Sequence, residues 1–212
     1  MSQIPARWYF DVISPFAYLH FKQFHRLHGL LSVEYVPVLF AGFLKHWETK
    51  GPAELPAKRI HTYRQCVWLA GQAGVPFNAP PRHPFNPLAI LRLLIALGCR
   101  REHVDTAFTF IWGDGRDAEA EWSALCDALG APDAEAMIQD PATKSRLTAN
   151  TAEAAARGVW GVPTFEVQGQ LFWGLDTIEW MNAFIDNPQL FETDGMRRAD
   201  ATKAGVVRRG VG

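Results

Sequence analysis

The 212-residue sequence predicts an α/β fold that is interrupted by a large all-helical insertion. Three observations support this fold class. A strand, a helix and a second strand follow one another near the N-terminus, residues 43–158 carry only helical patterns, and strand character returns after Gly158 in a short hairpin before a last helix. The first helix would be a right-handed crossover between two parallel strands.

The first strand and helix meet at Ser14-Pro15. Residues 7–13 are rich in aromatic and β-branched side chains, which is typical of a buried strand. Pro15 cannot continue a strand ladder but suits the first turn of a helix, and Ser14 is a favourable N-cap. We expect this helix to end near Gly29 and to bury an apolar stripe, which consists of Ala17, Phe21, Phe24, Leu27 and Leu31.

Residues 33–39 predict the second strand, which ends near Pro37. The insertion that follows predicts a helix whose buried face consists of Ile60, Tyr63, Val67 and Ala70. Residues 88–97 are apolar nearly all round and predict a helix enclosed in the protein, with Asn86 as its cap and Pro87 in its first position. A ligand-binding role is the alternative for Asn86.

Three further helices are predicted around residues 104–111, 119–129 and 143–157. Residues 164–168 and 171–174 then predict an antiparallel hairpin with Gly169-Gln170 as its turn. The last helix would bury Ile178, Met181, Phe184 and Ile185. The chain after residue 192 has no periodicity, and we expect residues 193–212 to form a disordered tail.

Composition favours small-molecule or protein partners. The formal net charge of −1 argues against nucleic-acid binding, which needs concentrated Lys and Arg. The longest apolar stretch, residues 87–98, is too short to cross a bilayer, and no secretory signal precedes the first strand, so a cytoplasmic location is expected.

The cysteines and histidines predict no metal site. Cys66, Cys99 and Cys126 are far apart and lack metal-ligand spacing, which favours buried, reduced thiols. His25 and His28 lie three residues apart, but no third ligand accompanies them.

Ser14 and the Val162-Pro163 dipeptide are candidates for binding chemistry. A helix N-terminus stabilises an anion such as a thiolate, to which the Ser14 hydroxyl can donate a hydrogen bond; the alternative is that Ser14 is only a cap. A cis bond before Pro163 would expose the Val162 backbone to an extended, peptide-like ligand. The alternative is that Pro163 only marks a strand edge.

Charged residues offer similar pairs of interpretations. Asp176 either caps the last helix together with Glu179 or binds an ammonium group, and both roles can hold at once. Lys58 and Arg59 are either a solvated pair or cations that reach an anionic ligand, while Glu54 is placed to pair with Lys58 at i,i+4.

Six segments carry a resemblance to 2-hydroxychromene-2-carboxylate isomerases, which belong with the kappa-class glutathione transferases in the DsbA-like branch of the thioredoxin superfamily. The segments are residues 10–19, 51–59, 74–77, 83–88, 158–165 and 172–176. The resemblance covers about residues 5–186. It implies a thioredoxin-like domain of residues 1–42 plus 159–192, an inserted helical domain of residues 43–158, and a homodimer.

The resemblance also implies that glutathione is the cofactor and supplies a thiol that the chain lacks, with Ser14 hydrogen-bonded to its sulfur. The backbone at Val162, before Pro163, would pair with its cysteinyl part. Its γ-glutamyl end would lie against Trp173, Gly174, Leu175 and Asp176, with Asp176 on the ammonium group.

Lys58, Arg59 and Asn86 are the expected contacts for the glycine end or for a small aromatic carboxylate substrate. The implied activity is glutathione-dependent isomerisation in aromatic catabolism. The alternatives are a kappa-like transferase and a non-catalytic glutathione-binding protein. A dithiol oxidoreductase is disfavoured because Ser14 and Ala17 occupy both cysteine positions. Thr177 and Thr49 depart from the family pattern, where arginine and asparagine are usual.

Overall fold

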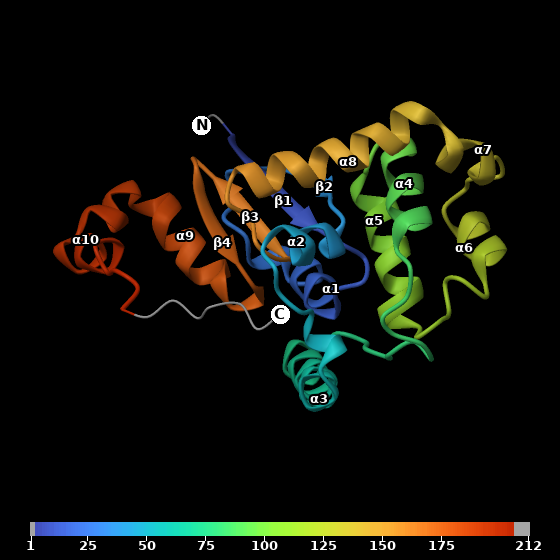
Figure 1. Ribbon diagram of the computed structural model, residues 1–212, viewed down its shortest axis with the longest axis horizontal. Coiled ribbons are helices and arrows are strands. Elements are labelled where there is room, and N and C mark those ends of the chain that lie inside the picture. Colours follow the sequence, from blue (N-terminus) through green and yellow to red (C-terminus); the bar gives the residue numbers. More distant parts are fainter. Residues whose placement is uncertain (1–2, 206–212) are drawn as a thin grey trace.

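A four-stranded mixed sheet lies at the centre of the protein, which confirms the predicted α/β class (Figure 1). The computed structural model describes residues 3–205. The sheet order is β2-β1-β3-β4, with β1 parallel to β2, antiparallel to β3, and β3 antiparallel to β4. The strands are β1 (Ile4–Phe10), β2 (Leu31–Pro37), β3 (Thr164–Val167) and β4 (Gln170–Trp173).

Helices account for most of the remaining chain. They are α1 (Pro15–Phe21), α2 (Phe40–His46), α3 (Pro56–Ala73), α4 (Leu88–Ala96), α5 (Arg101–Phe108), α6 (Trp122–Ala128), α7 (Ala134–Gln139), α8 (Pro141–Ala156), α9 (Ile178–Asp186) and α10 (Asp194–Asp200). A π-helical turn, Thr109–Gly113, extends α5. Short 3₁₀ helices span Phe24–Arg26, Pro52–Glu54, Leu175–Thr177 and Pro188–Glu192.

The alternation of β1 separates two apolar layers. Trp8 and Phe10 belong to the larger core, where Trp8 packs on Phe21 of α1 and Phe10 on Phe108 of α5. Tyr9 points to the opposite face and packs in a smaller cluster with Phe43 of α2 and Ala154 of α8. Successive side chains of a strand point to opposite faces, so helices cover the sheet on both sides.

The helix α8 connects the predicted insertion to the sheet. Its Asn150 side chain donates to the Pro37 carbonyl (Nδ2 to O, 3.0 Å), and its Thr151 hydroxyl accepts from the Leu39 amide (2.9 Å). In Figure 1, α8 runs from the group formed by α4 to α7 across to the sheet. The division of the chain at residues 43 and 158 stays a prediction, because α8 packs against both parts.

The first strand and the first helix have other bounds than those predicted. β1 begins and ends three residues earlier than predicted, because the Asp11 carboxylate accepts from the Ile13 amide (3.0 Å) and turns the chain before Ser14. The helix ends at Phe21 rather than near Gly29, and Leu31 is the first residue of β2. The predicted apolar stripe is therefore wrong beyond Phe21, where the helix ends.

The predicted buried face of α3 is wrong at two of its four residues, and right at Ala70. Ile60 and Val67 are 53% and 60% exposed, whereas Cys66 and Ala70 are buried. α3 packs against α1 on one side. Apolar residues on its other sides, such as Ile60 and Val67, are not covered by the described part of the chain.

The C-terminal hairpin is confirmed with a shift of one residue. Val167 pairs with Gln170, so Gln168-Gly169 forms the two-residue turn in place of Gly169-Gln170. Both residues have positive φ (49° and 80°), as a tight turn between twisted strands requires.

The tail predicted for residues 193–212 contains the helix α10, capped by the Thr193 side chain, which accepts from the Met196 amide. The disorder predicted for residues 194–200 is therefore wrong. The part of the prediction that concerns residues 206–212 lies outside the described residues. Among residues 3–205, no helix is both long and apolar enough to cross a membrane.

Candidate functional site

Ser14 stands where β1 turns into α1. Its Oγ accepts a hydrogen bond from the Ala17 amide (3.2 Å), which confirms the predicted N-cap. The hydroxyl proton stays free to donate. Ser14 is 9% exposed, and it lines a cavity of about 610 Å³.

A buried carboxylate supports the loop that carries Ser14. Asp11 is fully buried and lines the same cavity, and its second oxygen accepts from the Phe40 amide at the start of α2 (2.9 Å). Burial raises the pKa of Asp11 to about 7, although hydrogen bonds from the Ile13 and Phe40 amides oppose this shift. Our reading of the sequence missed Asp11; a carboxylate at the end of an apolar strand is the signal that marks it.

The Val162-Pro163 bond is cis. Among the described residues, neither backbone polar atom of Val162 makes a hydrogen bond, whereas the Pro163 carbonyl accepts from the Gly174 amide (2.9 Å). Val162 therefore presents unpaired backbone groups beside the Ser14 junction, and it lines two adjoining cavities.

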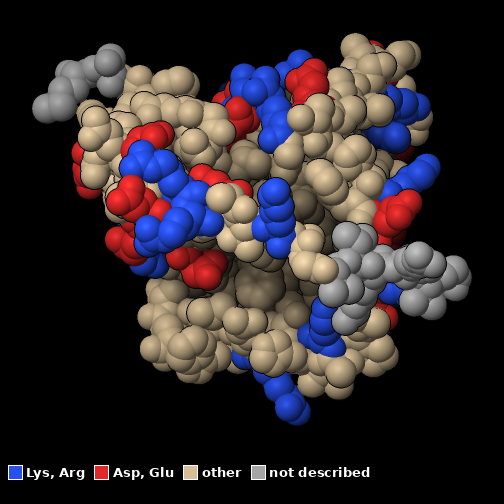
Figure 2. Space-filling model, turned by 60° about the vertical axis from the view of Figure 1, so that its left-hand side comes forward, with Lys and Arg blue, Asp and Glu red and all other residues tan. Residues whose placement is uncertain are grey.

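The second cavity, of about 750 Å³, brings together six of the predicted site residues. One wall consists of Val162, Pro163, Trp173, Gly174, Leu175 and Asp176. Polar residues of α3, Gln65 and Gln72, and residues that follow α1, Gln23, His25 and Arg26, line the rest. Figure 2 shows one face of the molecule, which is hollowed near its centre, with Lys and Arg side chains close to the hollow.

Asp176 does not cap α9. The helix begins at Ile178 after Thr177, which makes no capping hydrogen bond with its side chain, and Glu179 pairs instead with Arg26 (Oε1 to Nη2, 2.8 Å). The predicted capping arrangement is therefore wrong. The Asp176 carboxylate is exposed on the cavity wall and engages no hydrogen bond or ion pair within residues 3–205.

The predicted cations and Asn86 are only partly assembled at the site. Arg59 lines the Ser14 cavity, but Lys58 is exposed and lines neither cavity, and Lys50 lies on the wall in its place. Glu54 accepts from the Gly51 amide (2.6 Å), a contact that replaces the predicted pair with Lys58.

Asn86 serves the start of α4. Its Oδ1 accepts from the Leu88 amide (3.1 Å), but the helix begins at Leu88 with Pro87 at the N-cap, so the predicted cap is displaced by one residue. The side chain is exposed and lines neither cavity.

The surroundings of the three cysteines disfavour the thiolate form. Cys66 and Cys126 are buried and Cys99 is half-buried. Burial raises the pKa of Cys66 and of Cys99 to about 12, and it also raises the pKa of Cys126. His28 lies 3.3 Å from Asp186, and the described part of the chain contains no group of three His, Cys, Asp or Glu residues suited to a metal ion.

Two further polar residues of the Ser14 cavity were missed from the sequence. The Tyr63 hydroxyl and the Nδ1 atom of His83 are 2.6 Å apart, and the Nε2 atom of His83 lies 2.9 Å from the Ile13 carbonyl. Twenty residues separate Tyr63 from His83 on different elements, so no local pattern could have joined them.

The mixed sheet, the capped serine at the β1–α1 junction and the cis-proline loop beside it define a thioredoxin-like protein. A family model described as a DSBA-like thioredoxin domain matches residues 7–186, and the chain belongs to this family.

Relatives of two kinds are similar to the chain. The kappa 2 glutathione S-transferase of Caenorhabditis elegans is 26% identical over 207 residues, which span 86% of this chain and 92% of the relative. The 2-hydroxychromene-2-carboxylate isomerase of Sphingobium xenophagum is 26% identical over 190 residues, spanning 84% and 96%. A solved isomerase of the same name superposes with a TM-score of 0.75 at 21% identity and covers 94% of this chain and all of its own. The predicted resemblance and its thioredoxin-like, DsbA-like fold are thus confirmed.

Proposed function

We propose that the protein is a glutathione-dependent isomerase that converts 2-hydroxychromene-2-carboxylate-type substrates into trans-benzylidenepyruvates during aromatic catabolism. One observation carries the proposal: Ser14, the unpaired Val162 backbone and the free Asp176 carboxylate lie on the walls of two adjoining cavities. Bound glutathione would supply the thiol nucleophile that the chain itself lacks.

The residues present fit a γ-glutamyl tripeptide. The free backbone groups of Val162 can pair with an extended peptide, and Ser14 has a hydroxyl proton to donate to a sulfur atom. Asp176 offers a carboxylate to an ammonium group. Ser14, Val162 and Asp176 each line at least one of the two cavities.

Arg26 supplies a cation on the cavity that holds Asp176. It is 42% exposed and donates to Gln23 and Glu179, and its guanidinium has five N–H donors in all. An α-amino acid head group carries an ammonium and a carboxylate, for which Asp176 and Arg26 are complementary partners. We propose that Arg26 compensates for Thr177, which stands where the resemblance places an arginine.

The Ser14 cavity fits an aromatic carboxylate. Phe40, Phe85 and Trp160 give it apolar walls, and Arg59 and Lys50 supply cations to which a carboxylate of the substrate or of the glycine end can bind. Lys58 and Asn86 are not part of this proposal, since they line neither cavity. The proposal includes a cytoplasmic location and a homodimer.

The second candidate is a kappa-like transferase that conjugates glutathione to electrophiles. The relatives favour the transferase as strongly as the isomerase. The kappa 2 transferase and the isomerase described above are each 26% identical to this chain. A glutathione-binding protein without turnover is the third candidate.

Spectrophotometric turnover of 2-hydroxychromene-2-carboxylate, with and without glutathione, tests the proposal. We expect turnover only with glutathione, a large loss in Ser14→Ala, and native rates in Ser32→Ala, which removes an exposed serine of β2. No turnover with glutathione present would overturn the isomerase.

The other candidates give distinct results. Conjugation of 1-chloro-2,4-dinitrobenzene without isomerisation would support the transferase. Calorimetric binding of glutathione with neither reaction would support the binding protein.

A further inference from the structure

A hydrogen-bonded tyrosine and histidine stand in the wall of the Ser14 cavity. Tyr63 comes from α3 and His83 from the segment before α4, and both line the cavity. The Tyr63 hydroxyl is 2.6 Å from Nδ1 of His83, and Nε2 of His83 is 2.9 Å from the Ile13 carbonyl. The imidazole therefore connects Tyr63 to the residue that precedes Ser14.

The contacts determine the tautomer of neutral His83. A carbonyl oxygen can only accept, so Nε2 carries the proton that is donated to Ile13. In the neutral ring Nδ1 then has no proton and accepts from the Tyr63 hydroxyl. The Tyr63 oxygen keeps its lone pairs for a ligand in the cavity.

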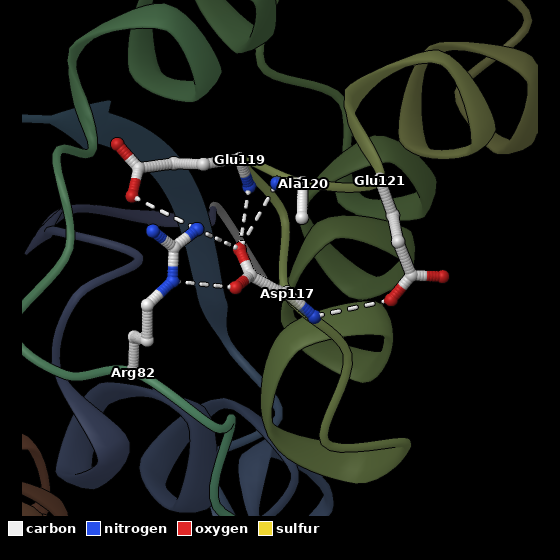
Figure 3. Close-up of polar contacts among 5 residues, drawn as sticks. All are labelled: Arg82, Asp117, Glu119, Ala120 and Glu121. Carbon is white, nitrogen blue, oxygen red and sulfur yellow. Dashed lines mark hydrogen bonds and ion pairs between the residues drawn. The ribbon is translucent and has the colours of Figure 1, made fainter.

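The structure holds His83 in place from several sides. Its ring packs against Phe85 and Trp112. Arg82, the preceding residue, forms two hydrogen bonds with the Asp117 carboxylate (2.7 and 2.9 Å), and Asp117 also accepts from the amides of Glu119 and Ala120 (Figure 3). The segment that carries His83 is thus tied to the loop before α6.

The surroundings of His83 favour the neutral ring. Burial lowers its pKa, the Ile13 hydrogen bond opposes this, and the Arg59 charge lowers the pKa further. The other titratable or charged groups that line the cavity are Asp11, Lys50, Glu54 and Tyr63. A neutral imidazole at neutral pH is able to receive a proton.

We propose that Tyr63 and His83 form a proton relay, in which Tyr63 takes the proton of a thiol held beside Ser14 and His83 stores it. The inference rests on the proposed function for the thiol ligand. It assigns roles to two residues that lie 49 and 69 positions beyond Ser14 in the sequence.

The relay moves one proton and forms no bond between ligand and protein. Tyr63 accepts the proton at Oη while its own hydroxyl proton passes to Nδ1 of His83, so Tyr63 stays neutral and His83 becomes an imidazolium. The Ile13 carbonyl then accepts from a cationic N–H, which is a stronger hydrogen bond. The reverse transfer returns the proton to the product, or to solvent when a halide is the leaving group.

His83→Gln and Tyr63→Phe separate proton transfer from structural support. Glutamine keeps one donor and one acceptor but cannot take up a proton. We expect either variant to lower kcat/KM by about 100-fold or more, with 2-hydroxychromene-2-carboxylate or 1-chloro-2,4-dinitrobenzene, and to leave the calorimetric affinity for glutathione unchanged. The double variant should be no slower than the single ones.

The matched controls are His61→Gln, an exposed histidine of α3, and Tyr35→Phe, a half-buried tyrosine of β2 outside both cavities. Thermal unfolding identifies any variant that fails to fold. In the pH profile of kcat/KM, the acidic limb should disappear in His83→Gln and persist in both controls.

A second readout needs no turnover. NMR titration of the His83 ring, assigned with His83→Gln, should give a pKa below 6.5 in the native protein and a higher value in Tyr63→Phe, because the lost hydroxyl stabilised the neutral ring. An unchanged titration in Tyr63→Phe, or near-native kcat/KM in His83→Gln, would overturn the relay. Absence of glutathione binding by the native protein would instead overturn the proposed function.

Discussion

The Asp11 carboxylate accepts a hydrogen bond from the Phe40 amide, 2.9 Å away, and so joins the loop that carries Ser14 to the first turn of α2. The same carboxylate accepts from the Ile13 amide. Two backbone donors satisfy the group, but full burial still disfavours its charge. Burial therefore raises the pKa of this acid to about 7.

Asp11→Asn is expected to change how stability depends on pH. The folded pKa of about 7 lies above the ordinary 3.8, so between these values the folded state binds the extra proton. The Asp11 contribution to the free energy of unfolding then falls by about 1.4 kcal/mol per pH unit as pH rises from about 4 to 7. The difference between native protein and variant, measured by urea unfolding across pH, should follow this slope.

His20 provides the opposite control. Burial lowers its pKa from 6.5 to about 3, so its contribution to stability grows as pH rises between these values. His20→Phe should therefore change the pH slope in the reverse sense. Parallel curves for the native protein and Asp11→Asn would contradict the assignment.

Ser14→Ala is expected to lower the free energy of unfolding by about 1 kcal/mol, because the variant loses the cap of α1. Ser14→Thr keeps a capping hydroxyl and should lose less. Chemical denaturation measures this effect apart from catalysis. A stability loss in Ser14→Ala several times larger would indicate that the loop has rearranged.

Arg26 is expected to recognise the α-carboxylate of the γ-glutamyl head group, and Asp176 its ammonium group. Arg26→Gln should weaken glutathione binding by a factor of about 3 to 10, since the guanidinium is partly exposed and already engaged by Glu179. It should not weaken binding of γ-aminobutyryl-cysteinylglycine, which lacks the α-carboxylate. Calorimetry measures both affinities.

Two variants complete that experiment. Glu179→Gln frees Arg26 and should strengthen glutathione binding. Asp176→Asn should weaken binding of glutathione but not of a glutaryl analogue without the ammonium group. Equal losses of both ligands in Arg26→Gln would mean that Arg26 acts only on the structure of the cavity.

Arg82→Gln is expected to loosen the segment that holds His83, because it removes both hydrogen bonds to Asp117. The His83 pKa should then move towards its ordinary value of 6.5 as the ring becomes more hydrated. NMR titration measures the shift. Arg197→Gln, which breaks a surface pair with Asp194, is the matched control and should leave the titration unchanged.

The outer face of α3 is the place where we expect a second copy of the chain to bind. Ile60, Val67 and Trp68 are each more than half exposed on this one helix, and clustered apolar exposure is typical of interfaces. Val67→Glu should shift the sedimentation coefficient of a dimer to that of a monomer. Ala199→Glu on α10 should not, and a native protein that sediments as a monomer would contradict the homodimer.

The sequence identified the elements whose patterns are local. The cap at Ser14 follows from neighbouring residues, whereas the sequence left open whether the bond before Pro163 is cis. Ile60 and Val67 of α3 were wrongly predicted to be buried, because apolar spacing does not reveal what covers a helix. The strand end at Phe10 was missed because the Asp11 turn replaces strand pairing with side-chain hydrogen bonds.

Some residues of the site were predicted and others were missed, because the missed ones meet only through the path of the folded chain. Val162 and Asp176 were predicted through family resemblance, and they line one cavity. Tyr63 and His83 meet only because the chain between α3 and α4 returns to the β1–α1 loop. Lys58 was predicted in place of Lys50 because neighbouring cations cannot be distinguished before the path of the loop is known.

The raised pKa values of the three cysteines affect how these residues would react with small thiols. A thiol whose pKa is raised well above neutrality is a poor partner for disulfide exchange, and Cys66 and Cys126 are also buried. Glutathionylation at these positions is therefore disfavoured in a protein that we propose to bind glutathione. Oxidised glutathione would then compete with the reduced form only as a reversible ligand.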